Sequence, residues 1–225
     1  MIKTQNRYIR DFDFDTESYY AVKHKYEPSN ICEMPVKWSM AKDFNVYDDK
    51  GTKWIDMTSG IFVTNAGHSN PNINLAIKTQ VDSDLTFSYQ YNSDMRDKFI
   101  KKLFEISPPH YDKVVLLNSG SEVTDAAYRL IKIWGKKHNK KYIVTFTGSY
   151  HGHVLGSDLI SGTSTSTDWC NFKDKEIWFL PFPKEGDELD LNDLPPLDEI
   201  AAFFLETYQG WGCLDVSTEI YRQTI

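Results

Sequence analysis

Cysteine and long apolar runs are scarce in this sequence of 225 residues. Its three cysteines, Cys32, Cys170 and Cys213, are far apart and odd in number, and no zinc-binding spacing exists among them. No stretch approaches the ~20 apolar residues of a membrane-spanning helix, and the first residues contain no apolar run typical of a secretory signal. We therefore expect a soluble protein of a reducing compartment, located in the cytoplasm, without a membrane partner.

Positive charge and nucleotide-binding motifs are also lacking. The 25 lysines and arginines are outnumbered by 32 acidic residues, which leaves a net charge of −7 and disfavours a nucleic-acid partner. A short basic cluster at residues 136–141 falls where a helix is expected to end, and the helix dipole favours cations there. Neither G-x-G-x-x-G nor G-x-x-x-x-G-K-[ST] occurs in the sequence, so a generic nucleotide-binding domain is a weak interpretation.

What the sequence does contain is enough apolar surface for a core. Apolar residues make up 40% of the chain, and the aromatic residues comprise 13 Phe, 13 Tyr and 6 Trp. Hairpin chemistry at residues 48–51 joins two β-prone runs within residues 44–57, and helices are expected over residues 71–81 and 94–105. The polar and aromatic residues 1–30 resemble an arm that packs on another surface.

From residue 113 onward the chain alternates between strand and helix patterns. Apolar runs predict strands over residues 113–117, 141–146, 176–180 and 199–206. Between the first two runs, a helix is predicted over residues 122–137, with an inward side formed by Val123, Ala127, Leu130, Ile131 and Trp134. This alternation predicts an α/β fold, with a mostly parallel sheet flanked by helices.

Three clusters of polar residues follow these strands, at the edge of the sheet where open α/β folds bind ligands. Ser119, Gly120 and Ser121 follow the first strand. Gly120 allows an anion to approach closely, and the amides of residues 120–122 lie at the positive end of a helix dipole. The same residues fit a plain helix cap, with Ser119 or Ser121 as the cap and Glu122 or Asp125 in the first turn. Local chemistry leaves both interpretations open.

The second cluster is Tyr150-His151-Gly152-His153, and the third contains Glu206. A tyrosine at a strand end can stack on a flat heterocycle. His151 and His153 are two positions apart without a third ligand nearby, so a metal site is a weak interpretation and a hydrogen-bonding role for His151 is the better one. Glu206 ends a very apolar run, so it is either paired or functional, unless the strand simply reaches the surface there.

Taken together, four segments resemble the class III aminotransferases, the pyridoxal-phosphate enzymes of fold type I, from about Val36 to residue 225. The similar segments are, in order, VYDDKGTKWIDMTSGIFVTNAGHSNP, NSGSEVTDAAYRL, FTGSYHGH and FLETYQGWG. Thr207 departs from the family pattern, which has proline there. By this resemblance residues 1–70 are an N-terminal arm and small-domain segment, and residues 71–225 are the N-terminal half of the cofactor-binding large domain.

The resemblance implies a role for each candidate residue. Ser119, Gly120 and Ser121 would hold the phosphate of pyridoxal 5′-phosphate. Tyr150 would stack on its ring with His151 beside it, and Glu206 would lie near the ring and the substrate. The substrate would meet Ile61, Phe62, Val63 and His153. The implied reaction transfers an amino group from a primary amine or amino acid to a keto acid or aldehyde, in an enzyme that is a homodimer.

Two residues that this chemistry needs have no counterpart in the sequence. In the family, the Schiff-base lysine and the aspartate that keeps the pyridine nitrogen protonated both follow the segment at Glu206, so no catalytic residue is assigned. We therefore expect a truncated chain, or half of a split enzyme whose C-terminal half is encoded separately. Alone, such a chain is expected to aggregate or to stay partly unfolded.

The family topology, as interpreted from the sequence, leaves gaps in the sheet. It separates the strand ending at Leu117 from the others by strands of the missing half. It also separates the strand ending at Glu206 from the strand ending at Phe146 by the strand that carries the missing aspartate.

The substrate is weakly constrained. His153 stands where acetylornithine-type relatives usually carry arginine, which argues mildly against that substrate. YHGH is closer to the glutamate-semialdehyde aminomutase pattern, but the remaining segments do not decide for it, and sugar-amine, ω-amino acid and diamine substrates stay open. An alternative from another class is a catalytically inactive, aminotransferase-like interaction protein. The missing lysine favours this alternative, whereas Gly120, Ser121 and Tyr150 disfavour it, because a binding module needs no cofactor pocket.

Overall fold

The computed structural model describes residues 36–88, 91–163, 172–183, 187–188, 190–210, 212 and 214–215. The expected arm of residues 1–30 lies outside this range. The chain divides into two compact units, of which unit 1 ends at Phe99 and unit 2 begins at Ile100. The domain boundary predicted at residue 70 concerns the complete enzyme and stays a prediction.

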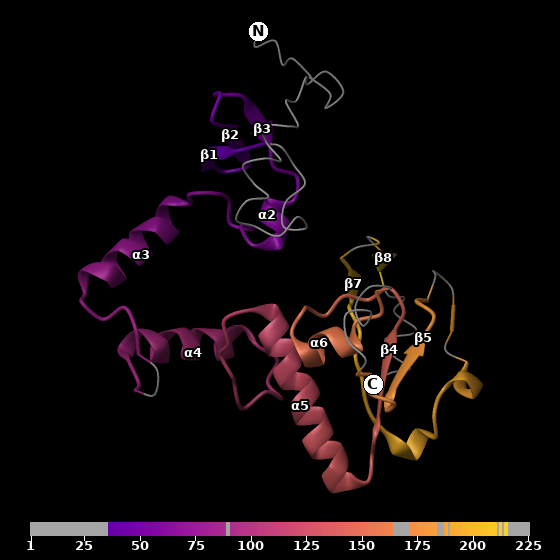
Figure 1. The fold of residues 1–225 in the computed structure, drawn as a ribbon. Helices are drawn as coiled ribbons and strands as arrows, with labels where there is room; N and C mark the ends of the chain where they lie inside the picture. The colour runs from indigo at the N-terminus through magenta and orange to yellow at the C-terminus, as the bar shows by residue number, and fades with distance from the viewer. Residues whose placement is uncertain are drawn as a thin grey trace. The chain divides into compact units, whose positions relative to one another are not determined.

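Unit 1 contains a small antiparallel sheet with the strand order β1-β2-β3 (Figure 1). The strands are β1 (Trp38–Lys42), β2 (Asn45–Asp48) and β3 (Lys53–Ile55). The predicted hairpin between β2 and β3 is confirmed. The Asp48 carboxylate accepts hydrogen bonds from the amides of Lys50 and Thr52 and from Nε1 of Trp54, at 3.0, 2.7 and 3.0 Å. The Asp48 carboxylate therefore holds the turn between β2 and β3 in place.

A short turn and two helices follow the sheet. α2 (Ser59–Phe62) has positive φ angles throughout, so it is left-handed. α3 (Pro71–Asp82) begins at the cap Asn70, whose side chain accepts from the amides of Asn72 and Ile73. α4 (Asp94–Ile106) follows, and the division between the units falls inside it. Both predicted helices are confirmed within one residue at each end.

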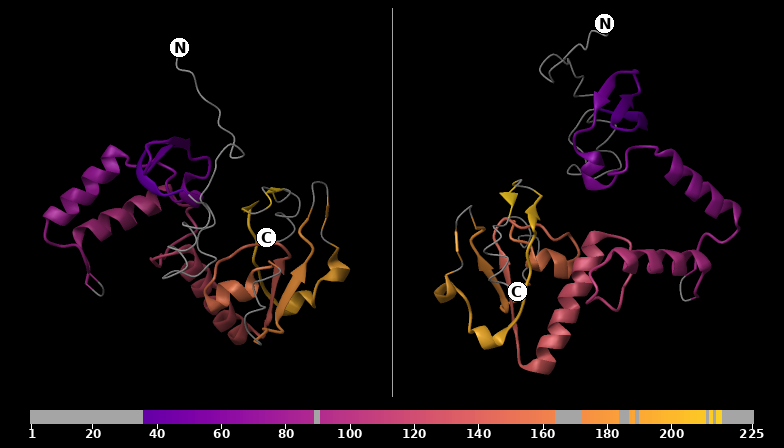
Figure 2. Two further views of the ribbon diagram at one scale, coloured as in Figure 1. Left: turned by 45° about the horizontal axis from the view of Figure 1, so that its top comes forward. Right: turned by 180° about the vertical axis from the view of Figure 1, so that it is seen from behind.

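Unit 2 is built on a parallel sheet with the order β5-β4-β6. Its strands are β4 (Tyr142–Phe146), β5 (Ile177–Leu180) and β6 (Ile200–Phe203). The helices are α5 (Gly120–His138) and α6 (Leu155–Ile160), which pack on each other on the same side of the sheet (Figures 1 and 2). The described residues also include the turns η2 (Leu191–Asp193) and η3 (Leu197–Glu199) and the short hairpin of β7 (Tyr208–Gln209) and β8 (Leu214–Asp215).

The core of unit 2 lies along the β4–β5–β6 sheet. Val144, Phe146 and Leu180 are buried there, and the half-buried side chains packed against them include Phe182, Leu194, Ile200, Phe203 and Leu205. The predicted α/β fold with a parallel sheet and flanking helices is therefore confirmed. Within the described ranges, no helix combines the length and the apolar character that a bilayer crossing requires.

The predicted gap between the strands ending at Phe146 and Glu206 is wrong. β6 pairs directly with β4, with Ala202 opposite Ile143 and Phe203 opposite Val144. The ladder continues past the strand, since the Phe204 amide donates to the Val144 carbonyl at 2.7 Å. Backbone groups that are already paired leave no room for another strand between β4 and β6.

The predicted strand at residues 113–117 is also wrong, because this segment has no regular structure here. Val115, Leu116 and Leu117 are 66%, 39% and 42% exposed, respectively. A strand is stable only when its backbone pairs with a neighbour, and the described part of the chain supplies no partner for these residues. The apolar pattern thus identifies a segment that could form a strand, but it does not show whether a partner strand is present.

The predicted inward side of α5 is only partly correct. Ala127 and Ile131 are half-buried, but the predicted Val123, Leu130 and Trp134 are exposed by 47%, 61% and 46%. Together with the exposed Ile133, these three residues form an apolar surface that we call the α5 stripe. The helix instead turns Asp125, Tyr128 and Gly135 toward α6 and the sheet.

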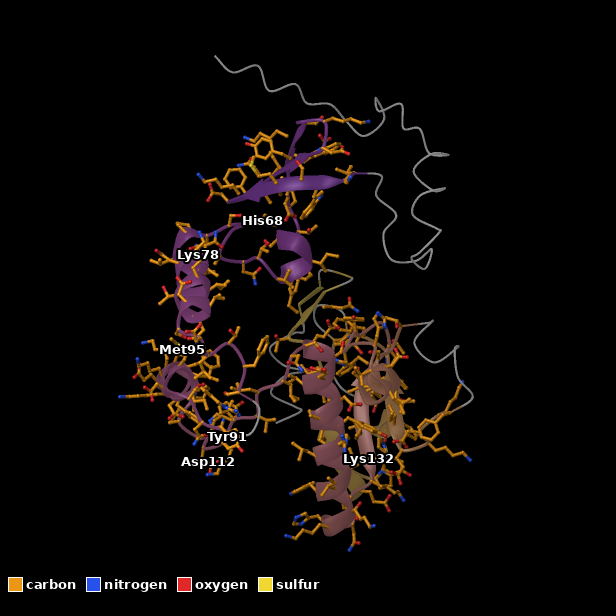
Figure 3. All side chains as sticks on the ribbon, turned by 60° about the vertical axis from the view of Figure 1, so that its left-hand side comes forward. His68, Lys78, Tyr91, Met95, Asp112 and Lys132 are labelled. Atoms are coloured by element: carbon orange, nitrogen blue, oxygen red, sulfur yellow. The ribbon has the colours of Figure 1, made fainter. Side chains whose placement is uncertain are left out.

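A polar cluster fixes the buried side of α5 to the segment that leads into β5. Lys132 Nζ lies 2.8 Å from Asp174 Oδ2 and also pairs with Glu176, and Figure 3 shows this lysine on α5. The Tyr128 hydroxyl donates to Asp174 Oδ2 at 2.7 Å. Burial, together with the hydrogen bond and negative charge of Asp174, raises the pKa of Tyr128 well above its ordinary value.

Candidate functional site

The turn before α5 is closed by a reciprocal cap. Ser119 Oγ accepts from the Glu122 amide at 3.3 Å. In return, Glu122 Oε2 accepts from the amides of Asn118 and Ser119 at 2.8 and 3.0 Å. This capping box shows that Ser119 and Glu122 hold the start of the helix. The expectation that the Glu122 amide is free for an anion is therefore wrong.

The same turn still has room for an anion. In the described part of the chain, the amides of Gly120 and Ser121 donate no hydrogen bond. A Cβ placed on Gly120 would meet no atom within 4 Å, so the space above this residue is open. Two amides at the start of a 19-residue helix carry the positive end of its dipole. The cap interpretation is therefore confirmed for Ser119, and the anion site at Gly120 and Ser121 stays a prediction.

The loop after β4 packs on the first turn of α5. Ser121 Oγ accepts from the His153 amide at 3.2 Å, and the Thr124 hydroxyl donates to the His151 carbonyl at 2.5 Å. Gly152 lies so close that an added Cβ would be 2.4 Å from Ser121 Oγ. The loop thereby brings the half-buried Tyr150 to the same edge of the sheet as Gly120 and Ser121.

Glu206 holds the other side of this loop. Its Oε2 accepts from the Tyr150 amide at 2.9 Å, and its Oε1 accepts from the Gly210 amide at 3.2 Å. The buried Gln209 adds a third contact by donating from Nε2 to the Gly148 carbonyl at 3.0 Å. Glu206 is therefore paired with backbone amides, as one of the sequence interpretations required, and it fixes the position of Tyr150.

His151 is a buried member of the scaffold beneath the loop, with 7% of the residue exposed. Its amide donates to Ser161 Oγ at 2.9 Å, and its Nε2 lies 3.4 Å from Thr145 Oγ1. Its ring meets Phe204 edge-on, with 4.8 Å between the ring centroids. Burial lowers the pKa of His151 to about 4, so the ring is neutral at pH 7. The hydrogen-bonding role proposed from the sequence fits these contacts.

His153 is the exposed histidine of the loop, with 80% of its side chain accessible. Its ring meets Tyr150 edge-on with centroids 5.2 Å apart, and its Nδ1 lies 3.8 Å from Asp158 Oδ1. Among the residues that the structure describes, no three histidine, cysteine or acidic side chains gather closely enough to hold a metal ion. His153 thus stands beside Tyr150 with its ring available to a ligand.

The predicted entrance residues Ile61, Phe62 and Val63 lie in unit 1, where they are 76%, 64% and 78% exposed. In the same unit, the Asp56 side chain is nearly buried, and its carboxylate lies 2.7 Å from His68 Nε2. The hydrogen bond from His68, with others from Thr58 and Gly60, holds the pKa of Asp56 well below its usual range.

Sequence reasoning missed Thr124 and Gln209 as residues that position the site. Thr124 could have been found, because it lies three positions after Ser121 and shares its side of the helix. Gln209 had no comparable signal, since its contact spans 61 positions in the chain.

Comparison with protein families gives a match to the model described as Aminotransferase class-III over residues 26–225. Acetylornithine aminotransferase of Xanthomonas campestris pv. campestris is 33% identical over 177 residues, which cover 74% of this chain and 41% of that protein. Mitochondrial ornithine aminotransferase of Rattus norvegicus is 32% identical over 214 residues, which cover 89% and 44% of the two chains.

Solved structures show the same fold. An omega-aminotransferase from Paracoccus denitrificans matches with a TM-score of 0.78 and 22% identity, over 91% of this chain and 52% of that chain. Ornithine aminotransferase from Toxoplasma gondii ME49 matches with a TM-score of 0.76 and 22% identity, over 92% and 49%. The chain therefore spans about half the length of these structures, and somewhat less than half of the two relatives above.

Proposed function

This chain belongs to the class-III aminotransferase family, and from that premise we propose that it serves a pyridoxal-phosphate-dependent amino-group transfer. The donor is a primary amine or amino acid, and the acceptor is a keto acid or aldehyde. The observation that carries the proposal is the open turn before α5, held directly against the Tyr150 loop. Each relative named above is an aminotransferase, and none supports the alternative of an inactive interaction protein.

The residues of unit 2 fit pyridoxal 5′-phosphate. The two amides of Gly120 and Ser121 and the Ser121 hydroxyl suit its phosphate, because Ser121 Oγ can still donate its proton while it accepts from His153. Tyr150 offers a flat ring for stacking, and the buried His151 supports the loop from below. When bound, the cofactor supplies an electron sink for the carbon that loses a proton.

The remaining site residues orient these groups. Glu206 fixes the Tyr150 amide and thereby the position of the ring. His153, exposed next to Tyr150, is proposed to face the substrate, and so are Ile61, Phe62 and Val63. The named relatives differ in their donors, so the proposed substrate class stays at a primary amine or amino acid.

We further propose that catalysis requires a C-terminal half that supplies the family's lysine and aspartate, in a cytoplasmic enzyme that forms a homodimer. The exposed α5 stripe and the unpaired apolar residues Val115 and Leu117 support this, since both are surfaces suited to burial. The chain's coverage of about half of its structural neighbours agrees with such an arrangement.

The test of the function is to mix the chain with the C-terminal half of a relative and to titrate the soluble complex with pyridoxal 5′-phosphate. We expect visible cofactor absorbance to appear, and we expect Tyr150→Ala to weaken cofactor binding at least tenfold. Tyr111→Ala is the matched control, because Tyr111 is an exposed tyrosine of unit 2 whose ring packs on His110. A soluble complex without cofactor absorbance, or equal effects of the two variants, would refute the proposed site.

A further inference from the structure

The α2 turn of unit 1 has a backbone conformation that side chains rarely tolerate. Ser59, Gly60, Ile61 and Phe62 have φ angles of 52°, 61°, 61° and 63°. Gly60 adopts this conformation freely, but the other three residues carry a Cβ, and Ile61 is also β-branched. Consecutive left-handed residues of this kind persist only where neighbouring groups hold them in place.

The Asp56 carboxylate is the group that holds this turn. Its Oδ1 accepts from the amide and the hydroxyl of Thr58, at 2.9 and 2.8 Å. Its Oδ2 accepts from the Gly60 amide at 2.8 Å and lies 2.7 Å from His68 Nε2. Both oxygens are used, and 4% of the Asp56 side chain is exposed. A carboxylate with this many donors fixes the entry to the turn.

His68 connects Asp56 to the sheet of unit 1. Its amide donates to the Asp43 carbonyl at 2.7 Å, and its carbonyl accepts from the Asp43 amide at 2.8 Å. Its ring meets Trp38 edge-on, with 5.7 Å between the centroids. His68 is thus fixed to β1 and to the turn before β2, so the sheet provides a rigid base for the carboxylate.

The turn determines where three large apolar side chains point. Ile61, Phe62 and Val63 are all mostly exposed, although burial of such side chains is normally favourable. An apolar hollow of about 590 Å³ lies beside them, with Trp38, Trp54, Met57 and Ile61 in its wall. The strained backbone therefore directs apolar surface outward.

We propose that Asp56 and His68 are positioning residues, which hold residues 59–62 in the left-handed turn and so present Ile61, Phe62 and Val63 for contact with a substrate. Which molecule these side chains meet rests on the proposed function. That the carboxylate and the imidazole hold the turn does not depend on it.

Amide hydrogen exchange of the turn in the soluble 225-residue chain tests the proposal. The amides of Phe62, Val63 and Thr64 donate to carbonyls of residues 58 and 59, so their exchange reports directly on the turn. We expect Asp56→Asn to accelerate exchange over residues 58–64 at least tenfold, while exchange in β4 stays unchanged. We expect His68→Ala to accelerate it about threefold, because the donors from Thr58 and Gly60 remain. Asp49→Asn is the matched control, since Asp49 is an exposed aspartate of the neighbouring hairpin.

A glycine rescue separates a role in holding the strained turn from a general effect on folding. Ile61→Gly removes the strain at φ 61°, so the double variant Asp56→Asn/Ile61→Gly should recover most of the lost protection. Val63→Gly is the matched control, because Val63 is an equally exposed β-branched neighbour with φ −107°. The double variant Asp56→Asn/Val63→Gly should recover none of the lost protection.

Two results would overturn the proposal. One is unchanged exchange in Asp56→Asn, and the other is equal recovery by the two glycine variants. If Asp56→Asn is insoluble, chymotryptic cleavage after Phe62 in dilute extract replaces exchange as the readout, with the same order of variants expected. Neither measurement needs cofactor or substrate, so failure of the proposed function would leave the expected results unchanged.

Discussion

At the scale of single residues, burial decides the protonation of His151. In the unfolded chain this histidine has the ordinary pKa of ~6.5, whereas burial in the folded chain holds the pKa at about 4. Between these values the unfolded state binds the additional proton, so stability rises with pH across this window and is lost as pH falls through it. The full effect of such a difference is about 3 kcal/mol.

We therefore predict that, in a soluble complex of the wild-type chain with a C-terminal half, the free energy of unfolding falls by about 2–3 kcal/mol between pH 7 and pH 4.5 through this histidine. His151→Asn removes the titrating group, so its stability should change correspondingly less over the same range. Urea unfolding of the soluble complex at both pH values measures the difference. His110→Asn, at an exposed histidine, should follow the wild type. Equal pH dependence of wild type and His151→Asn would contradict the prediction.

Residue types indicated which candidate residues lie near one another, but they did not predict the contacts that these residues make. The sequence allowed either a cap or an anion site at residues 119–121, and the structure shows the cap at Ser119 while it leaves the space at Gly120 open. Glu206 was expected to be either paired or functional, and the structure pairs it with the backbone amides of Tyr150 and Gly210. Backbone partners leave no trace in the sequence, because any residue has an amide.

At the scale of secondary-structure elements, a close approach of backbone to backbone joins α5 to the Tyr150 loop. Gly152 has φ +123° and faces Ser121 so closely that a Cβ would overlap Cα, Cβ and Oγ of that residue. Gly51 also has a positive φ, +78°, but no atom lies within 4 Å of its Cβ position. A substitution at Gly51 would therefore add backbone strain alone, whereas one at Gly152 would add both backbone strain and steric overlap.

We predict that Gly152→Ala destabilises the chain by about 3 kcal/mol or more, since it adds overpacking to backbone strain. Gly51→Ala should cost only about 1 kcal/mol, from strain alone. Chemical unfolding of the two variants, each in a soluble complex with a C-terminal half, measures both values. Gly152→Ala should also weaken cofactor binding to the complex, whereas Gly51→Ala should not. Similar losses of stability in the two variants would show that the loop can move away from α5.

Elements were predictable where the chain supplies their partners. β4, β5 and β6 follow from their apolar runs, because each pairs with another of the three. Residues 113–117 show the same pattern but have no strand to pair with among the described residues. The pairing of β6 with β4 was missed, since the apolar pattern of a strand does not specify its neighbour.

At the scale of the whole molecule, the α5 stripe dominates the behaviour expected of the chain alone. Val123, Leu130, Ile133 and Trp134 expose apolar surface along one helix, although helices of globular proteins normally bury such a side. Exposed apolar surface of this extent favours association. The stripe therefore connects the prediction of aggregation to particular residues.

We predict that Leu130→Lys increases the soluble, monomeric fraction of the isolated chain severalfold and reduces its assembly with a C-terminal half. Arg129→Lys, at the neighbouring exposed position, should change neither. Size-exclusion chromatography of each variant, with and without the second half, measures both effects. A cooperative, monomeric thermal melt of the wild-type chain by itself would contradict the expectation that it needs a covering partner.

The reciprocal cap of Ser119 and Glu122 has a consequence for how the cofactor comes and goes. Because side chains of the turn itself satisfy the start of α5, the helix needs no ligand to keep its first turn in shape. Under the proposed function, the amides of Gly120 and Ser121 are already oriented before the cofactor binds, so the bound phosphate would cost little chain entropy. On the same proposal, release of the cofactor would leave the first turn of α5 folded and able to bind the next molecule.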